Sequence, residues 1–321
     1  MKNPFSMFLI SVVVVLFCSQ ATIHAQNCAS VNIHEPADQA ATKPFRDALY
    51  RHRPVLRFDS DEQFFPVRAE AVTNHNGNRL VREDGDLIRE RVNGRGLSIR
   101  YLRHGDSNYP TPDVNGDSDV RGSDDVNLAG RRPGDFVGDD RRLENAIYTR
   151  ICYQREGTQI TSAWLQYWFF YYYNDYPGTD SFDHEGDWEM VQILVNAQAR
   201  PSLAVYASHS SGLVADWDTG VERTGLGRVR PIVYVARGSH ASYFHARPCK
   251  TDIHVDGERE LPKYRYIRLG SKTTRTWLSW PGQWGGSGTS PHGPRFQSGG
   301  KWNDPTQFFE NSFRSDCLDV F

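Results

Sequence analysis

Short segments in which apolar and polar residues alternate, or apolar residues run continuously, recur along the chain, and apolar residues at helical spacing are scarce. Clusters of Gly, Pro, Asn and Asp separate these segments and predict turns. Residues 36–52 and 139–148 predict two short helices. The predicted strands are 54–58, 97–102, 146–153, 161–173, 188–195, 203–208, 231–237 and 264–269. This pattern predicts an all-β fold, a β-sandwich with long loops and a few short helices, formed as one domain by residues 26–321.

The N-terminal segment has the features of a secretory signal peptide. Lys2 precedes an apolar run over residues 8–17, and small residues follow, including Ala21 and Ala25. The run is about half of the roughly 20 residues that a membrane-spanning helix needs. We therefore predict that residues 1–25 are removed, with cleavage after Ala21 or Ala25. The mature chain is then secreted or periplasmic and has no transmembrane segment.

Charge and composition exclude two broad classes of protein. The 37 Lys and Arg residues balance 39 Asp and Glu residues, giving a net charge of -2 without the basic excess of a nucleic-acid-binding protein. Hydrophobic residues at 38% and charged residues at 24% are typical of a globular chain and not of a disordered one. No nucleic-acid partner is therefore expected. We expect no organic cofactor either.

Four cysteines remain after the predicted cleavage: Cys28, Cys152, Cys249 and Cys317. An even number in an exported chain predicts two disulfides, and three pairings are open. Their spacing excludes a Cys-x-x-Cys knuckle, so any metal would be held by oxygen and imidazole.

The segment from Asp183 to Glu189 is the most informative motif in the chain. In a strand, residues two apart share a face, so Asp187 and Glu189 lie in line with the apolar residues of 191–195. A buried carboxylate is costly unless it is paired or bound to a metal. With His184 just upstream, these residues predict half of a hard-metal site, and pairing with Arg residues is the alternative.

Two other strands end in ionisable groups. His209 ends an apolar alternating row, and Gly238 can permit a bulge that redirects the residues after it. Strands ending this way predict one polar pocket at a common sheet end, whereas a structural, hydrogen-bonded role is the alternative for each histidine. The residues expected to line the pocket are Trp188, His209, Arg237, Ser239 and His240.

An acidic loop resembles an EF-hand or dockerin-type calcium loop. Ser118 stands where such a loop has its turn glycine, and an Asp takes the place of the final Glu. A solvated Asp- and Gly-rich loop is the alternative. The candidate ligands are Asp113, Asn115, Asp117, Asp119 and Asp124.

Two groups of aromatic residues allow two interpretations each. The run over residues 167–173 predicts a strand buried on both faces, in preference to an exposed stacking platform. Trp277, Trp280 and Trp284 lie among Gly and Pro residues. They fit either exposed loops that stack on sugars or touch a membrane, or a tryptophan cluster that closes one end of the sandwich.

Several blocks of sequence together resemble the vacuolar protein sorting-associated protein 62 family. They span much of the mature chain: 54–58 with Glu62, 65–66, 165–170 with 174–175, 184–189, 236–244, 282–285, 291–294 and 301–305. This resemblance implies no defined biochemical activity.

The 184–189 motif is also similar to the Gly-His-Arg-His-Asp-Trp-Glu heptad of the necrosis- and ethylene-inducing-peptide-like cytolysins. That resemblance implies a β-sandwich that binds a divalent cation, Mg²⁺ or Ca²⁺, and sphingolipid sugar headgroups. The ligands of the family fall on Asp175, His184, Asp187 and Glu189. Glu185 and Gly186 stand where the heptad has Arg and His, so the resemblance does not extend to the headgroup specificity of the toxins.

Two functions of different classes follow from these observations. The first is a secreted, divalent-metal-binding β-sandwich protein that recognises a glycan or lipid headgroup at a cell surface, with peripheral membrane contact and cytolysis as extensions. The alternative is a metal-dependent hydrolase that uses a metal-bound water, with Glu189 or His240 as general base. Binding is preferred because the sequence contains no clear catalytic motif.

Overall fold

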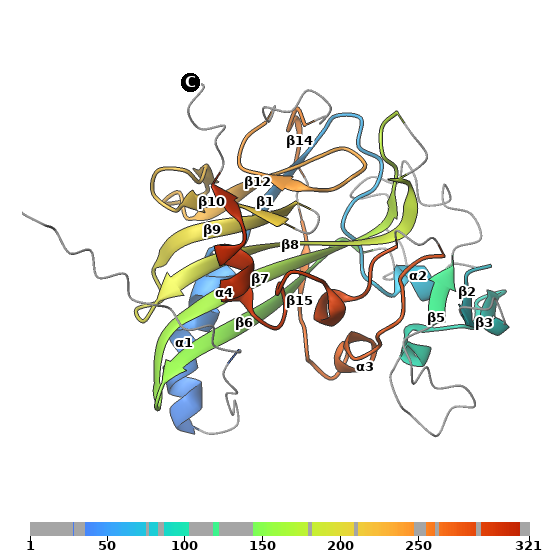
Figure 1. Ribbon diagram of the computed structural model, residues 1–321, viewed down its shortest axis with the longest axis horizontal. Helices are drawn as coiled ribbons and strands as arrows, with labels where there is room; N and C mark the ends of the chain where they lie inside the picture. The colour runs from blue at the N-terminus through green and yellow to red at the C-terminus, as the bar shows by residue number, and fades with distance from the viewer. Residues whose placement is uncertain are drawn as a thin grey trace, which may run out of the picture.

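The computed structural model describes residue 28 and residues 36–74, 77–82, 87–102, 118–121, 144–178, 182–208, 211–246, 255–260, 263–286 and 290–314. Strands dominate this part of the chain, and the few helices are short except α1 (Figure 1). The predicted all-β class is confirmed.

One large sheet forms the centre of the molecule. Its seven strands lie in the order β15-β6-β7-β8-β9-β10-β16. The central hairpins are antiparallel, whereas the edge strands β15 and β16 pair in parallel with their neighbours. The strands are β6 (Ala146–Glu156), β7 (Gln159–Asn174), β8 (His184–Asn196), β9 (Pro201–Ser208), β10 (Ser211–Asp216), β15 (Arg265–Arg268) and β16 (Phe313–Arg314).

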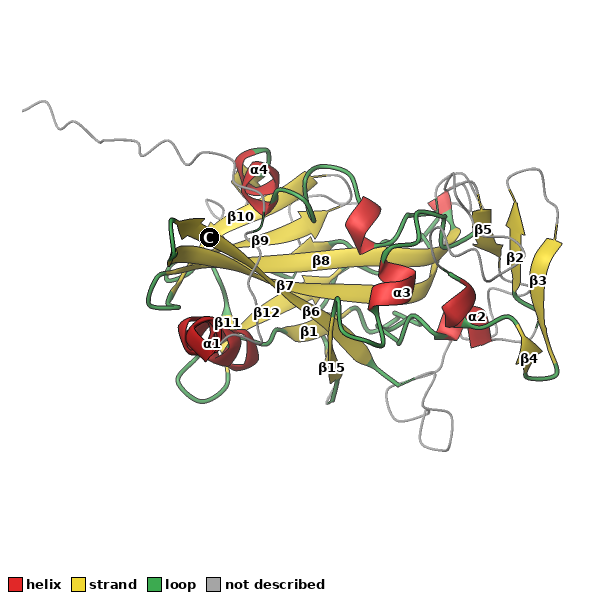
Figure 2. Cartoon of the chain, turned by 90° about the horizontal axis from the view of Figure 1, so that it is seen from below, coloured by secondary structure: helices red, strands yellow, loops and turns green. Residues whose placement is uncertain are grey.

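A smaller sheet packs against one face of the large sheet and makes the sandwich (Figure 2). Its order is β11-β12-β1-β14, with β13 added beside β12, and β1 runs parallel to β12. Buried residues of both sheets, such as Leu56, Val233, Leu165 and Val191, form one continuous core between them. The strands are β1 (Val55–Phe58), β11 (Arg223–Thr224), β12 (Arg230–Val235), β13 (Ser242–Tyr243) and β14 (Arg259–Glu260).

The opposite face of the large sheet is also covered, which explains the continuous aromatic run. Residues that alternate along β7 enter two different cores: Tyr167 and Tyr171 face the second sheet, whereas Trp168 and Phe170 face the outer layer. A strand buried on both faces has no polar side and reads as an unbroken apolar segment. The core-packing interpretation of residues 167–173 is confirmed.

The outer layer contains the three C-terminal tryptophans. Trp277 and Trp284 are buried and pack with Trp188 of β8, with ring centroids 5.4–5.6 Å apart. Trp280 packs edge-on against Trp284. The tryptophan cluster is therefore the correct interpretation of this segment, and these residues are not exposed stacking side chains. Trp277 lies in α3 (Arg275–Leu278).

The helices and a small end sheet complete the fold. α1 (Pro36–Arg51) lies where a helix was predicted. α4 (Pro305–Glu310) begins at Asp304, whose side chain accepts a hydrogen bond from the backbone of Gln307. The remaining elements are α2 (Ala71–Asn74), β2 (Arg79–Arg82), β3 (Leu87–Val92), β4 (Arg95–Gly96), η1 (Ile99–Tyr101), β5 (Ser118–Arg121) and η5 (Pro294–Phe296).

Two predicted elements differ from the structure in the residues that it describes. Residues 97–102 contain the 3₁₀ turn η1 in place of a strand, because Leu97 and Leu102 anchor the segment in the outer core at its two ends. Residues 146–148 of the predicted helix 139–148 belong to β6, because Ala146 and Ile147 pair with β15. The alternative prediction of a strand over 146–153 is confirmed.

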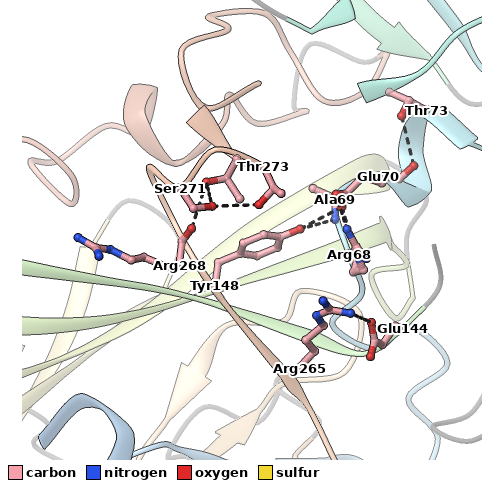
Figure 3. Close-up of polar contacts among 11 residues, drawn as sticks. Arg68, Ala69, Glu70, Thr73, Glu144, Tyr148, Arg265, Arg268, Ser271 and Thr273 are labelled. Atoms are coloured by element: carbon pink, nitrogen blue, oxygen red, sulfur yellow. Dashed lines mark hydrogen bonds and ion pairs between the residues drawn. The ribbon is translucent and has the colours of Figure 1, made fainter. Parts of the chain in front are cut away.

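A buried tyrosine holds the segment that precedes the end sheet (Figure 3). The hydroxyl of Tyr148 accepts a hydrogen bond from the backbone of Ala69 at 2.8 Å and lies 3.4 Å from a carboxylate oxygen of Glu70. Arg68 pairs with the same carboxylate at 2.7 Å. Burial and the charge of Glu70 raise the pKa of Tyr148 well above its ordinary value, so the phenol stays protonated.

One of the predicted disulfides lies in the described part of the chain. It joins Cys28 to Cys152 of β6 and so attaches a residue near the N-terminus to the large sheet. Several predictions fall outside the described residues: the signal peptide, His209, Cys249, Cys317 and the calcium-loop residues Asp113, Asn115, Asp117 and Asp124. Asp119 of that loop lies in β5, paired with Val81. Within the described ranges, every helix is too short or too polar to cross a membrane.

Candidate functional site

Two carboxylates of β8 lie between the sheets, on the face that the alternation predicts. Asp187 and Glu189 are only 6% and 3% exposed, and Val191 and Ile193 continue the same face into the inter-sheet core. Trp188 faces the opposite side and belongs to the outer tryptophan cluster, so it does not line this site. Burial of two carboxylates requires compensation by protons, hydrogen bonds or cations.

His240 supplies part of this compensation from the loop between β12 and β13. Gly238 in this loop has a φ of +72°, and a Cβ there would lie 1.8 Å from the main-chain oxygen of Asp175. Only glycine permits this approach, which lets the loop reach the end of β7. His240 itself has a φ of +52° and is fully buried. This backbone conformation is unfavourable for a residue with a Cβ, so the surrounding contacts must hold it in place.

The imidazole of His240 lies between two carboxylates. Nδ1 is 2.9 Å from Oδ2 of Asp187, and Nε2 is 3.7 Å from Oε1 of Glu62. Burial lowers the pKa of His240, but Glu62 and Asp187 outweigh burial and raise it to about 9. The side chain is therefore an imidazolium at neutral pH and carries one positive charge into the site.

Glu62, which follows β1, is held by the backbone. Its Oε1 accepts hydrogen bonds from the N–H groups of Gln63 and Phe64 at 2.8 and 2.7 Å, and its Oε2 accepts one from Gly238 at 2.8 Å. Burial raises the pKa of Glu62. His240 and the N–H groups of Phe64 and Gly238 lower this pKa by a larger amount, so its net shift is downward. Glu62 is therefore an anion held in one position, and its hydrogen bonds connect the Gly238 loop to the loop that follows β1.

Tyr171 of β7 forms the floor of the cluster. Its ring stacks on His240 with the centroids 3.7 Å apart and the planes 2° from parallel. Burial, followed by the charges of Asp187, Glu62 and Glu189, raises the pKa of the phenol well above its ordinary value. The three carboxylates therefore surround one buried ring, and we call Glu62, Tyr171, Asp187, Glu189 and His240 the acidic cluster.

The hairpin between β7 and β8 lies at the solvent-exposed end of the acidic cluster, which we call its mouth. Asp175 is exposed, and its pKa is raised by partial burial and by the charges of Asp183 and Glu62. Asp183 fixes the hairpin by accepting a hydrogen bond from the backbone of Tyr176 at 2.7 Å. Tyr176 packs edge-on against Phe182, which is 58% exposed. Carboxylates and an exposed aromatic side chain thus lie on one short hairpin.

His184 lies at the start of β8 and is engaged away from the carboxylates. Its Nδ1 is 2.9 Å from the main-chain oxygen of Gly186, so Nδ1 carries the proton. Its Nε2 is 3.1 Å from Nδ2 of Asn174 and accepts that hydrogen bond. Both ring nitrogens are occupied, and His184 could bind an ion only by exchanging its contact with Asn174.

The other predicted pocket residues lie around the cluster. Ser239 is buried beside His240. Arg237 pairs with Asp61 at 3.4 Å. Sequence reasoning missed Glu62 and Tyr171 as members of the cluster. The run Asp59-Ser60-Asp61-Glu62 directly after a strand was the available signal for Glu62.

The four predicted metal ligands are only partly brought together. Asp187 and Glu189 share the buried face and Asp175 lies at the mouth, whereas His184 is turned aside. In the described part of the chain, no three His, Cys, Asp or Glu side chains converge closely enough to hold a metal ion. By the chemistry of its donors, however, the cluster fits a divalent cation, because carboxylate oxygens such as those of Asp187 and Glu189 are the preferred ligands of Mg²⁺ and Ca²⁺.

Comparisons with known proteins give structural neighbours without establishing a family. No protein-family model matches the chain. A search of curated proteins found no match. The resemblance to the vacuolar protein sorting-associated protein 62 family is therefore unsupported.

The structural neighbours are necrosis- and ethylene-inducing proteins and toxin-fold proteins. A structure described as a toxin fold for microbial attack and plant defence is 13% identical and covers 74% of this chain and 79% of its own, with a TM-score of 0.36. Necrosis and ethylene inducing protein 2, from the agent of cocoa's witches' broom disease, is 8% identical over 69% and 72%, with a TM-score of 0.33. NLPPya in complex with mannosamine is 12% identical over 64% and 68%, with a TM-score of 0.31. These scores are too low to carry any conclusion about function.

Proposed function

We propose that the protein is a binding protein that recognises a glycan or lipid headgroup at a cell surface with the help of a divalent cation. The observation that carries the proposal is the position of the exposed Phe182, which packs on the half-buried Tyr176, on the hairpin that joins β7 to β8 beside the acidic cluster. Aromatic faces stack on sugar rings and enter membrane interfaces, and carboxylates bind cations and sugar hydroxyls.

The cation is an expectation that rests on the chemistry of the carboxylate donors. Asp187 and Glu189 would supply the buried ligands and Asp175 a ligand at the mouth. Glu62 is excluded from the set because backbone N–H groups occupy both of its oxygens. The cation would be held by the carboxylate oxygens of Asp187 and Glu189, and it would present an open side to a headgroup at the mouth.

The hydrolase alternative fits the site less well. A general base must come within hydrogen-bond reach of the attacking water, yet His240 is fully buried with Nδ1 engaged by Asp187. Glu189 is almost as deeply buried. A small ion can occupy such a place, whereas a substrate cannot reach these two side chains in this conformation.

Binding to lipid vesicles tests the proposal. We expect the mature protein to sediment with phosphatidylcholine vesicles that carry a glycosylated sphingolipid, and to remain in solution with phosphatidylcholine alone. Phe182→Ser should weaken sedimentation about tenfold, the effect of losing roughly 1.4 kcal/mol of aromatic contact. Leu226→Ser is the matched control, because Leu226 is fully exposed on a different hairpin. A dye-release assay on the same vesicles tests whether binding leads to lysis.

Two results separate the parts of the proposal. Binding that survives exhaustive chelation would remove the cation and leave headgroup recognition. Equal losses for Phe182→Ser and Leu226→Ser, or no binding on a broad glycan and lipid array, would contradict headgroup recognition at this hairpin.

A further inference from the structure

A concave site lies apart from the acidic cluster and shares no residue with it. A cavity of about 350 Å³ opens between α1, β6, the end of β15 and the segment around Trp302. Its lining includes three arginines, Arg46, Arg150 and Arg268, and none of the described residues that line it is Asp or Glu. The volume is within the range of small-molecule sites.

Arg150 of β6 is the unusual member of this group. Nη1 donates hydrogen bonds to Oε1 of Gln166 at 3.1 Å and to the main-chain oxygen of Trp302 at 2.7 Å, and Nη2 lies 3.0 Å from Sγ of Cys28. All of these partners are neutral. Burial, with the charge of Arg295 as a second cause, lowers the pKa of Arg150 to about 9. A desolvated guanidinium without a carboxylate partner is costly, so an anion would stabilise it strongly.

The other two arginines lie at the rim. Arg46 of α1 donates hydrogen bonds to two neutral groups, Thr42 and the main-chain oxygen of Gln39, and it forms no ion pair within 4.0 Å with a described residue. The side chain of Arg268 is exposed and has no hydrogen bond or ion pair within the described part of the chain. Figure 3 shows this guanidinium pointing away from the Tyr148 group, whereas Arg265 of the same strand lies against Glu144.

The walls of the cavity are aromatic and apolar, so a ligand that fills it also needs an apolar or ring surface. The guanidinium of Arg150 lies 3.7 Å above the ring of Trp302, and Leu49, Ile151 and Tyr153 contribute apolar surface. A bare inorganic anion would leave this surface unused. An anionic group attached to a small ring could meet the arginines with its charge and the aromatic walls with its ring face.

We propose that this arginine-lined cavity binds an organic anion of about monosaccharide size, with a phosphate or carboxylate held by Arg150, Arg46 and Arg268 and a ring packed against Trp302 and Tyr153. Arginine suits this role because its planar donors match phosphate and carboxylate oxygens. The site shares no residue with the acidic cluster, so this proposal does not depend on headgroup recognition at the hairpin.

Calorimetric titration of the mature protein tests the proposal with three probes: glucose 6-phosphate, glucuronate and inorganic phosphate, with glucose as the neutral control. We expect saturable binding of at least one of the two sugar anions, weaker binding of inorganic phosphate, and none of glucose. Comparing the affinity for glucose 6-phosphate with the affinity for glucuronate shows whether the site prefers a phosphate or a carboxylate. Binding should weaken as salt is raised, because the rim charges are exposed to screening.

Variants locate the binding. Arg268→Gln and Arg46→Gln should each weaken binding of the preferred sugar anion at least about fivefold, as expected for loss of one charged hydrogen bond. Arg265→Gln, which removes the same charge from the same strand outside the cavity, should leave binding unchanged. Arg150→Met should abolish binding; because Arg150 also supports Gln166 and Trp302, its result counts only if the melting temperature is retained.

Three results would overturn the proposal. The first is the absence of saturable binding of either sugar anion, and the second is glucose or inorganic phosphate binding as tightly as the sugar anions. The third is unchanged binding in both Arg268→Gln and Arg46→Gln, which would place the ligand elsewhere on the protein.

Discussion

Replacing Gly186 with alanine is expected to lower the free energy of unfolding by about 4 kcal/mol. The loop that carries Trp284 lies directly on the start of β8, so a Cβ on Gly186 would be 2.0 Å from the main-chain oxygen of Trp284. The φ of +63° at Gly186 adds a backbone penalty of roughly 1 kcal/mol. Backbone atoms cannot rotate away as a flexible side chain can, so the loop must separate from the strand.

Gly157→Ala is the matched control for this variant. Gly157 has a similar φ of +58°, but no atom lies within 4 Å of the Cβ that alanine would add. The control therefore isolates the backbone penalty, and we expect a loss of only about 1 kcal/mol. Denaturant unfolding of the two variants measures the difference. Equal losses would contradict the close approach of Trp284 to Gly186.

The disulfide between Cys28 and Cys152 is expected to contribute up to about 5 kcal/mol to the free energy of unfolding. It joins residues 124 positions apart, and the cost of closing so long a loop in the unfolded chain grows with the logarithm of its length. The double variant Cys28→Ser/Cys152→Ser removes the crosslink without leaving a free thiol. A loss below about 1 kcal/mol in urea unfolding would contradict this account.

Peptide mapping of the unreduced mature protein checks the pairing itself. Cys28 should be recovered linked to Cys152. Two intramolecular disulfides are expected in all, with Cys249 linked to Cys317 and no free thiol. Recovery of Cys28 linked to any other cysteine would contradict the structure described above.

Local periodicity was sufficient to predict most of the large sheet. β7 and β8 are long, strongly apolar and bounded by turn residues, so their existence and the inward face of Asp187 and Glu189 follow from alternation. Alternation predicted a strand over residues 97–102, and this prediction is wrong. Leu97 and Leu102 are buried because they flank a 3₁₀ turn that packs into the outer core. β10 was missed because Ser211, Gly212 and Asp216 weaken its apolar pattern.

The membership of the candidate site was harder to predict, because it depends on contacts between distant segments. Gly238 and Glu62 meet across 176 positions of sequence, and no local pattern indicates that pairing. A histidine near two carboxylates suggested a shared site, but the sequence could not show that His240, and not His184, contacts Asp187. The difference arises because the Gly238 loop turns inward, whereas His184 is held at the sheet end by Asn174.

The most direct test of the account is calorimetric titration of Ca²⁺ and Mg²⁺ into metal-free mature protein. We expect a divalent ion to bind with an affinity that Asp187→Asn and Glu189→Gln each reduce at least about tenfold, since each removes one charged ligand. Asp218→Asn, an exposed carboxylate that pairs with Arg223, should leave the affinity unchanged. Absence of saturable binding, or equal affinity in Asp187→Asn and Asp218→Asn, would contradict a cation at the acidic cluster.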